Sequence, residues 1–175
     1  MKKILLLFAL ATTIYSCSLA DKFNGDDQLP RATQIGANKV GCLVNGKVLI
    51  PTQRGLNTPV NCFYQFVDGE FYFTMAFTDM QNFGPSVNIF TSKVSLQANQ
   101  TYILNQGYNP SQGGGGEYFK NLSNKFNTTI EQTGELKITR LDLSNTIISG
   151  TFWFDAINSA GETVHITQGR FDWDY

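Results

Sequence analysis

His165 is the single histidine of the 175-residue sequence, and its surroundings offer the clearest set of side chains that could act together. Apolar and polar residues alternate over 147–157 and again over 164–167, which predicts two antiparallel strands. Pairing them with both apolar sets on one face places Asp155 opposite His165 on the other face, near Trp153. A carboxylate favours a protonated imidazole, and an indole face can stack on a sugar or another apolar ring. We expect a weak ligand-binding patch at Trp153, Asp155 and His165; the alternative is an ordinary cross-strand pair on an exposed sheet.

The register of this hairpin depends on its loop. Opposing residue numbers must share parity, and a three-residue loop over 159–161 satisfies this, with Gly161 in the left-handed conformation. The same register places Trp153 opposite Thr167. The parity then changes before the last apolar residues of the chain, so we expect a β-bulge at Gly169.

A second candidate region is the stretch GYNPSQGGGGEYF. It lacks the Lys-Ser/Thr ending and the following helix of a phosphate-binding loop. The run Gly113–Gly116 predicts a mobile surface loop, and such a loop carrying Tyr108 could grip a ligand. The alternative is that the flanking Tyr118 and Phe119 pack into the core.

Other patterns of catalysis and metal binding are missing from the sequence. One histidine is too few for a His or Cys metal site, and neither a G-x-S-x-G turn nor EF-hand spacing occurs. Asp142, in LDLSN, is expected to cap backbone amides of a turn. Two carboxylates that hydrolyse a glycoside are spaced in three dimensions, so that possibility stays open. We expect no enzyme activity, no cofactor and no metal.

Cys17 follows an apolar run at the start of the chain. Lys2 and Lys3 precede the run Ile4–Tyr15, which is shorter than the roughly 18 residues of a membrane-spanning helix. The charged start, the apolar run and the small Ser16 predict a secretory signal.

The residues Ile-Tyr-Ser-Cys that end this segment resemble a bacterial lipobox. The resemblance implies cleavage before Cys17 and acylation of its sulfur and amine, which suffices for stable membrane anchoring. The alternatives are an ordinary signal peptide that leaves Cys17 as a free thiol, and a retained transmembrane segment. In Gram-negative lipoproteins an Asp at the next position retains the protein in the inner membrane; Ser18 therefore favours the outer membrane, on its periplasmic face or at the cell surface.

Cys42 and Cys62 remain as an even pair in an oxidising compartment. An Asn-Gly turn in CLVNGKVLI and an Asp-Gly turn in CFYQFVDGEFYFTMAF define two hairpins. Their registers place Cys42 opposite Leu49 and Cys62 opposite Met75, with both thiols inward. We expect a buried Cys42–Cys62 disulfide worth about 3 kcal/mol. The alternative is two inert buried thiols.

The rest of the chain predicts short strands separated by turns, without a long helical period. The fold class expected is all-β, an antiparallel sandwich or barrel of about 10–12 strands. Residues 1–16 form the cleaved signal peptide, 17–37 a lipidated flexible tether, and 38–175 a single domain. The expected strands are 40–44, 47–50, 62–67, 70–78, 86–90, 101–104, 117–119, 125–130, 135–141, 147–157, 164–167 and 171–173.

Two segments, GANKVGCLVNGKVLIP and GELKITRLDLSNTIISGTFWFDAINSAGETVHITQGRFDWDY, resemble the start and the C-terminal part of a family of small Bacteroidota lipoproteins. That family is known only as a domain of unknown function. The resemblance implies export and an all-β fold, and it implies no activity.

The amino-acid composition limits the classes of partner that the protein is expected to bind. Charged residues make up 15% of the chain, and removal of the two lysines in residues 1–16 changes the formal charge from -1 to -3. Nucleic acid is therefore not an expected partner. We expect an outer-membrane-anchored binding module for a glycan, a small molecule or an envelope protein. The alternatives are a structural subunit of an envelope complex and, less favoured, a hydrolase with a carboxylate pair.

Overall fold

The computed structural model describes residues 29–81, 84–107 and 111–175, and the described chain is all-β. Residues 1–28, which include the expected signal peptide and Cys17, lie outside the described residues, as does the candidate Tyr108. No described helix is long and apolar enough to cross a membrane. The strands are β1 (Lys39–Val44), β2 (Lys47–Leu49), β3 (Val60–Val67), β4 (Glu70–Thr78), β5 (Ser86–Ser92), β6 (Thr101–Leu104), β7 (Gly113–Asn121), β8 (Asn124–Asn127), β9 (Gly134–Asp142), β10 (Ile147–Ile157) and β11 (Thr163–Asp174).

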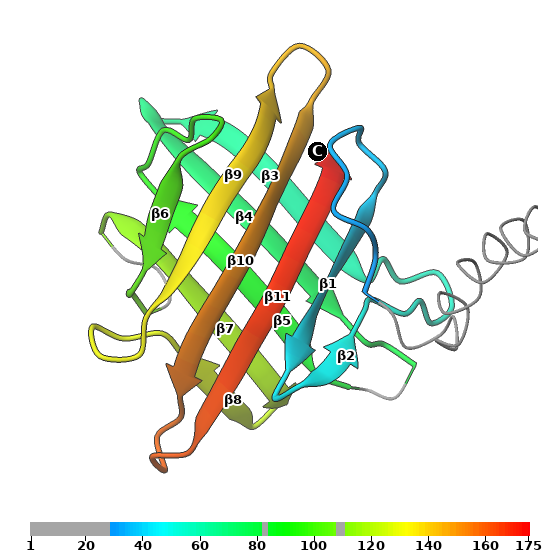
Figure 1. Ribbon diagram of the computed structural model, residues 1–175. Coiled ribbons are helices and arrows are strands. Elements are labelled where there is room, and N and C mark those ends of the chain that lie inside the picture. The colour runs from blue at the N-terminus through cyan, green and yellow to red at the C-terminus, as the bar shows by residue number, and fades with distance from the viewer. Residues whose placement is uncertain (1–28, 82–83, 108–110) are drawn as a thin grey trace, which may run out of the picture.

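All eleven strands belong to one sheet, in the order β2-β1-β11-β10-β9-β6-β7-β5-β4-β3, with β8 pairing β10 and β7. The pairs are antiparallel except β6 with β7, which meet in parallel at Leu104 and Gly114. The sheet folds over into two layers whose strands cross (Figure 1). The front layer holds β9, β10, β11 and β1, and the back layer holds β3, β4, β5 and β7. The expected all-β class is confirmed.

The core fills the space between the layers. Alternate residues of each strand point inward, so aromatic and branched side chains from both layers meet there. Phe73, Phe77 and Phe154 are almost fully buried. Full burial of one such ring contributes roughly 1.5–3 kcal/mol relative to exposure.

The local hairpins form as the turn residues predict. Asn45 (φ 48°) and Asp68 (φ 51°) adopt the left-handed conformation that two-residue hairpin turns require, each followed by a glycine. The predicted pairs of Cys42 with Leu49 and Cys62 with Met75 are confirmed. In the last hairpin Gly161 has a φ of 82°, and the expected register between β10 and β11 is confirmed up to the bulge.

The bulge lies one residue away from its expected position. Between Ile166 and Gly169, β11 has one residue more than the facing segment of β10, and Gln168 takes the left-handed φ of 52°. Trp153 therefore lies opposite the bulge, and no direct pair with Thr167 forms. Gly169 makes room for a ring, because a Cβ there would lie 2.5 Å from the Phe152 side chain.

The glycine run forms part of a strand, so the expected mobile loop at this position is wrong. Gly113–Gly116 begin β7, pairing with β5. A Cβ on Gly115 would lie 2.2 Å from the Gln106 carbonyl oxygen, and one on Gly116 would lie 2.7 Å from the Phe154 ring. These positions are glycine because other groups pack directly against the strand.

The structure does not form the expected Cys42–Cys62 disulfide; both residues are free thiols. Both side chains point inward as predicted, but on β1 and β3, strands close to opposite ends of the sheet order. The two thiols also lie in different surroundings, because they act on different tyrosines. Burial is the main cause that raises the pKa of both Tyr118 and Tyr175; a smaller electrostatic effect comes from Cys42 on Tyr118, and from Tyr64 and Cys62 on Tyr175. Burial raises the pKa of each cysteine thiol to about 12.

Residues 29–37, called here the N-terminal arm, lie against the sheet. The buried carboxylate of Asp172 accepts hydrogen bonds from the Thr33 hydroxyl (2.6 Å) and from the backbone N–H groups of Ile35 (3.0 Å), Gly36 (2.8 Å) and Ala37 (3.2 Å). These residues fall in the segment expected to be a flexible tether. The sequence analysis overlooked Asp172, because its partners come from the other end of the chain.

Candidate functional site

Asp155 and His165 are cross-strand neighbours on the outward face of β10 and β11, as predicted. The Nδ1 atom of His165 lies 2.7 Å from Oδ1 of Asp155, a hydrogen bond in which the imidazole N–H donates. The Asn45 side chain accepts a further bond from the His165 backbone N–H at 2.9 Å. The His165 and Asp155 side chains are 61% and 39% exposed, so this hydrogen-bonded pair lies at the surface and contributes at most about 1 kcal/mol.

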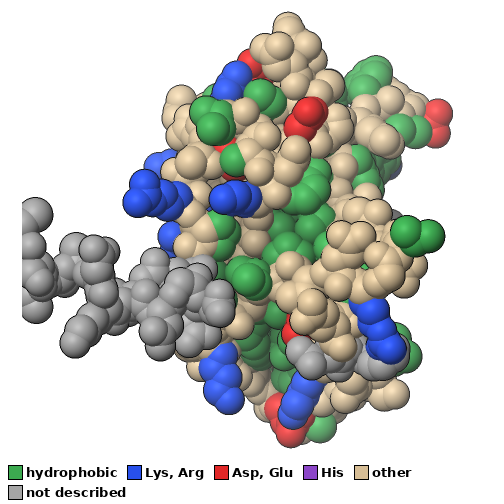
Figure 2. Space-filling model, turned by 90° about the vertical axis from the view of Figure 1, so that its right-hand side faces the viewer, with side chains coloured by type: hydrophobic (Ala, Val, Ile, Leu, Met, Phe, Trp, Pro, Cys, Tyr) green, Lys and Arg blue, Asp and Glu red, His purple; other side chains and the backbone are tan. Residues whose placement is uncertain are grey.

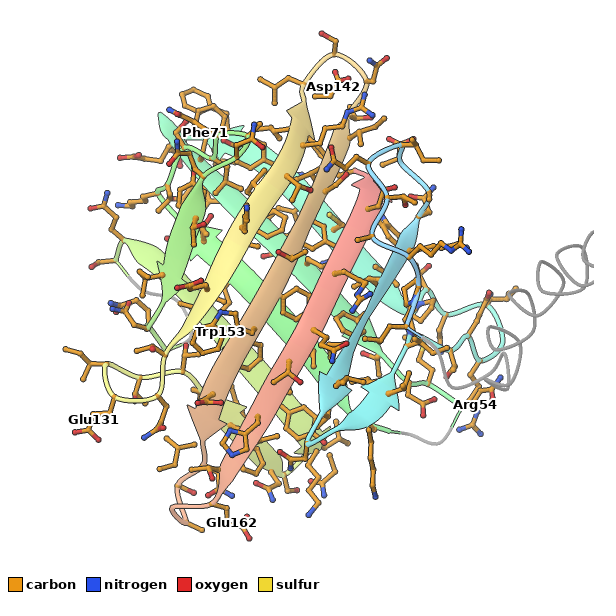
Figure 3. The ribbon with its side chains drawn as sticks, in the orientation of Figure 1. Arg54, Phe71, Glu131, Asp142, Trp153 and Glu162 are labelled. Atoms are coloured by element: carbon orange, nitrogen blue, oxygen red, sulfur yellow. The ribbon has the colours of Figure 1, made fainter. Side chains whose placement is uncertain are left out.

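Trp153 belongs to β10 and lies next to β9, on the same outward face as Asp155 and His165 (Figure 3). Its side chain is 41% exposed. It borders an open groove of about 310 Å³ that neither Asp155 nor His165 lines. The groove extends across β6, β9, β10 and β11. Its polar lining includes Thr101, Glu135, Lys137, Thr151 and Arg170.

Register explains why these side chains converge. Thr151 pairs with Lys137 of β9 and with Arg170 of β11, and Lys137 in turn pairs with Thr101 of β6. Directly paired residues of an antiparallel sheet share a face, so these four side chains form one row across the outer surface.

The neighbouring row contains the indole. Trp153 pairs with Glu135, and the indole Nε1–H points to a carboxylate oxygen of Glu135 at 3.4 Å, a long and weak hydrogen bond. The Glu135 carboxylate therefore sits at the edge of the indole. The groove thus combines a flat aromatic surface, a carboxylate, two cations and two hydroxyl groups.

Two irregular features shape the rim. The bulge places Gln168 and Gly169 along one side of the groove, and the N-terminal arm contributes Ala32. Bulges often redirect side chains at functional sites. The arm is fixed through Asp172, so that carboxylate supports the rim from outside the groove.

The sequence patterns identified Trp153 but missed Lys137, Glu135 and Thr101. Only the pairing of β6 with β9 and of β9 with β10 brings these residues beside the indole. The alternation over 135–139 does predict an outward face for the odd-numbered residues. That signal would have identified Glu135 and Lys137 as candidates once the β9–β10 hairpin was assumed.

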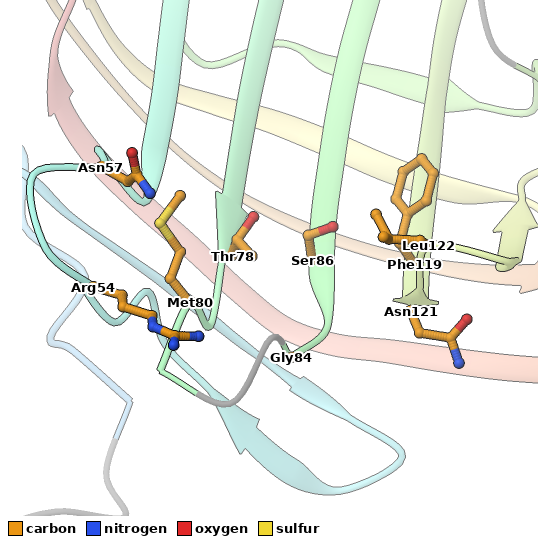
Figure 4. Close-up of a pocket in the computed structure, with 9 residues that line it drawn as sticks. All are labelled: Arg54, Asn57, Thr78, Met80, Gly84, Ser86, Phe119, Asn121 and Leu122. Atoms are coloured by element: carbon orange, nitrogen blue, oxygen red, sulfur yellow. The ribbon is translucent and has the colours of Figure 1, made fainter.

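A second cavity, of about 390 Å³, lies on the outer face of the back layer. Thr78 and Ser86 lie at its centre, Met80 on one side and Phe119 and Leu122 on the other (Figure 4). Apolar atoms make up most of the lining of this cavity, as they do in the groove at Trp153.

One buried carboxylate nearby has a structural explanation. Glu117 is 2% exposed, lies 2.5 Å from the Lys125 ammonium and accepts a hydrogen bond from Asn88 at 2.8 Å. Lys125 also lies over the Phe119 ring, 5.2 Å from its centroid. Glu117 is therefore neutralised within the back layer. Across residues 29–81, 84–107 and 111–175, no three His, Cys, Asp or Glu side chains are grouped in a way that could hold a metal ion.

Residues 81–172 match the family described as Domain of unknown function (DUF6252). The chain belongs to this family. The DUF6252 match begins before β5 and ends within β11, so it includes every strand that builds the groove at Trp153. It also includes Asp172. A domain of unknown function was the expectation from sequence, and DUF6252 confirms that part of it. Neither a search of curated proteins nor a search of solved structures found a match.

Proposed function

We propose that this protein is a non-catalytic binding module for a glycan, and that the groove at Trp153 is its binding site. The observation that carries the proposal is the 41% exposed indole beside a groove lined by hydroxyl, carboxylate and cationic side chains. Sugar rings present an apolar face that stacks on an aromatic ring, and hydroxyl groups at their edges that hydrogen-bond to such side chains. A smaller ligand with the same two surfaces would use the same groups.

The type of groups in the groove supports a proposal of binding rather than catalysis. Its most prominent element is an aromatic surface, and the carboxylate of Glu135 contacts the indole. His165 lies outside the groove and is paired with Asp155.

The proposed location is the outer membrane, through a lipid on Cys17. The support is the sequence of the first 17 residues: two lysines, an apolar run too short to span a bilayer, and a lipobox-like ending. The resemblance to Bacteroidota lipoproteins agrees with this location. The periplasmic face and the cell surface are both consistent with such an anchor, and surface proteolysis of intact cells distinguishes them.

Replacement of Trp153 tests the site. A glycan array screened with the wild-type protein identifies ligands, and titration calorimetry compares variants. We expect Trp153→Ala to weaken binding at least tenfold, about 1.4 kcal/mol, and Trp153→Phe to retain part of the affinity. The control is Phe66→Ala, which removes a 63% exposed ring far from the groove. Equal affinities of wild type and Trp153→Ala would refute the site.

A structural subunit of an envelope complex is the second candidate. β3 ends the sheet order and pairs with β4 alone among the described strands, so its other edge is open to a further strand. Figure 2 shows hydrophobic side chains gathered down the middle of the side of the molecule turned to the right in Figure 1. A protein that binds no glycan but copurifies with envelope proteins would favour this second function.

A further inference from the structure

We propose that the ligand of the Trp153 groove carries an anionic group, a carboxylate or a sulfate, and that Lys137 and Arg170 bind it. This inference rests on the proposed function and specifies the class of glycan: an acidic one. The evidence is the juxtaposition of two cations in the row beside the indole.

The two cations flank one residue. Lys137 and Arg170 both pair with Thr151, from β9 on one side and from β11 on the other. Neighbouring strands lie about 4.8 Å apart, so the two backbones are roughly 10 Å apart on the same face. Long side chains from both can reach a single anionic group above the Thr151 hydroxyl, which can donate a hydrogen bond to it.

Neither cation is neutralised by a described carboxylate. The Lys137 side chain forms no hydrogen bond or ion pair within residues 29–81, 84–107 and 111–175. The guanidinium of Arg170 donates to the Gln168 backbone carbonyl at 3.1 Å and to its side-chain oxygen at 3.4 Å. Both acceptors are uncharged, so they orient the guanidinium without cancelling its charge. The bulge at Gln168 is what brings these acceptors beside Arg170.

The one acidic residue of the groove is directed elsewhere. Glu135 lies next to Lys137 along the same face of β9, yet no ion pair joins them, and its carboxylate is engaged by the indole N–H. Charges in the groove are therefore separated: cations in the Thr151 row, a carboxylate in the Trp153 row. A ligand with its ring on Trp153 would place an anionic substituent over Lys137 and Arg170, with hydroxyl groups toward Glu135.

The chain as a whole favours the same interpretation. Acidic residues outnumber basic ones, with a formal net charge of -1. A pair of unneutralised cations beside an exposed tryptophan is therefore not a consequence of a generally basic surface. A bidentate guanidinium and a mobile ammonium are complementary to carboxylate and sulfate oxygens.

Pairs of ligands that differ only in charge test whether the groove binds an anionic group. We would titrate the full chain with oligogalacturonate, with its neutral methyl ester, and with inorganic sulfate, and repeat this with sulfated and desulfated carrageenan oligosaccharides, which carry no charge once the sulfate is removed. We expect at least one acidic glycan to bind tenfold or more tightly than its neutral counterpart at low salt. The preference should shrink in 1 M NaCl, where the Debye length falls to about 3 Å.

Variants then assign the residues. Lys137→Gln and Arg170→Gln should each weaken binding of the acidic ligand at least threefold more than they weaken binding of its neutral counterpart. Lys137 is exposed, so Lys137→Gln is expected to fold even if Arg170→Gln does not. Lys120→Gln, an exposed lysine at the end of β7, is the matched control and should change neither affinity.

The outcomes separate this inference from the proposed function. Equal binding of an acidic glycan and its neutral counterpart, both lost in Trp153→Ala, would overturn the anionic subsite and retain the glycan site. Inorganic sulfate binding as tightly as the acidic glycan would reassign the cations to a free anion. Failure of every glycan, acidic or neutral, to bind in a Trp153-dependent way would overturn both.

Discussion

The single side chain of Asp172 joins the N-terminal arm to the sheet through several hydrogen bonds. Burial on its own would raise the pKa of this carboxyl, but hydrogen bonds from Thr33, Ile35, Ser149 and Gly36 outweigh it and lower the pKa to about 2. A carboxyl whose pKa is lowered on folding stabilises the folded state above its unfolded pKa, near 3.8, and this contribution is lost as the pH falls toward 2.

Asp172→Asn should therefore lower stability at pH 7 by about 2 kcal/mol and flatten its pH dependence between pH 4 and pH 2. An amide cannot accept all the hydrogen bonds that the carboxylate accepts. Urea unfolding across this pH range measures both effects. Asp142→Asn is the control: hydrogen bonds with Asn145 and Arg140 lower the Asp142 pKa to about 2 as well, but at a surface turn where water can replace them. Comparable losses from both substitutions would contradict a special role of the arm.

Short-range sequence patterns predicted the exposed pair of Asp155 and His165, but they missed most of the residues that line the groove at Trp153. Asp155 and His165 follow from one hairpin and its loop parity, which are short-range properties of the sequence. Lys137 reaches Trp153 only through a second hairpin, and the N-terminal arm that hydrogen-bonds to Asp172 lies more than 130 residues away in the sequence. The free state of Cys42 was missed for the same reason, since two inward positions need not be adjacent.

At the scale of elements, three strands were predicted to the residue, whereas the expected strands 164–167 and 171–173 are one strand, β11, which continues across the bulge. The ends of β4, β6 and β10 match those expected from sequence. The start of β7 was missed because four glycines favour a loop in isolation. Packing overrides this preference here: Phe90 and the Gln106 carbonyl lie where a side chain of Gly115 would be.

Gly115→Ala should consequently destabilise the domain by about 1–3 kcal/mol, the usual cost of overfilling a packed site. The steric conflict involves a backbone oxygen, which cannot rotate away. Gly107→Ala serves as the comparison, because a Cβ there meets nothing within 4 Å. Chemical denaturation of the two variants measures the difference; a similar midpoint for both would mean that β7 leaves more room than the structure shows.

At the scale of the whole molecule, the arm extends the folded unit beyond the boundary expected at residue 38. The Pro30 ring lies beside Gly41 of β1, and Ile147 packs close to Gly36. Together with the Asp172 bonds, these contacts join the arm to both the edge and the centre of the front layer.

A chain that begins at Asn38 should be less stable than one that begins at Leu29 by about 2 kcal/mol, the contribution of hydrogen bonds to a charged acceptor. Thermal unfolding of the two chains provides the measurement. Identical unfolding temperatures would mean that the arm adds no stability and acts only as a tether.

The pairing of β1 with β11 has a consequence for how the domain assembles. Residues 39–44 find their partners at 166–172, so this part of the sheet forms only after nearly the whole described chain is available. Hairpins such as β3–β4 and β10–β11 can form early, because their closing loops are short. We expect folding to proceed from these hairpins, with β1 and the arm docking last. In a chain made from its N-terminus, β1 can pair with β2 at once through their tight turn, but its other edge would stay unpaired until β11 follows.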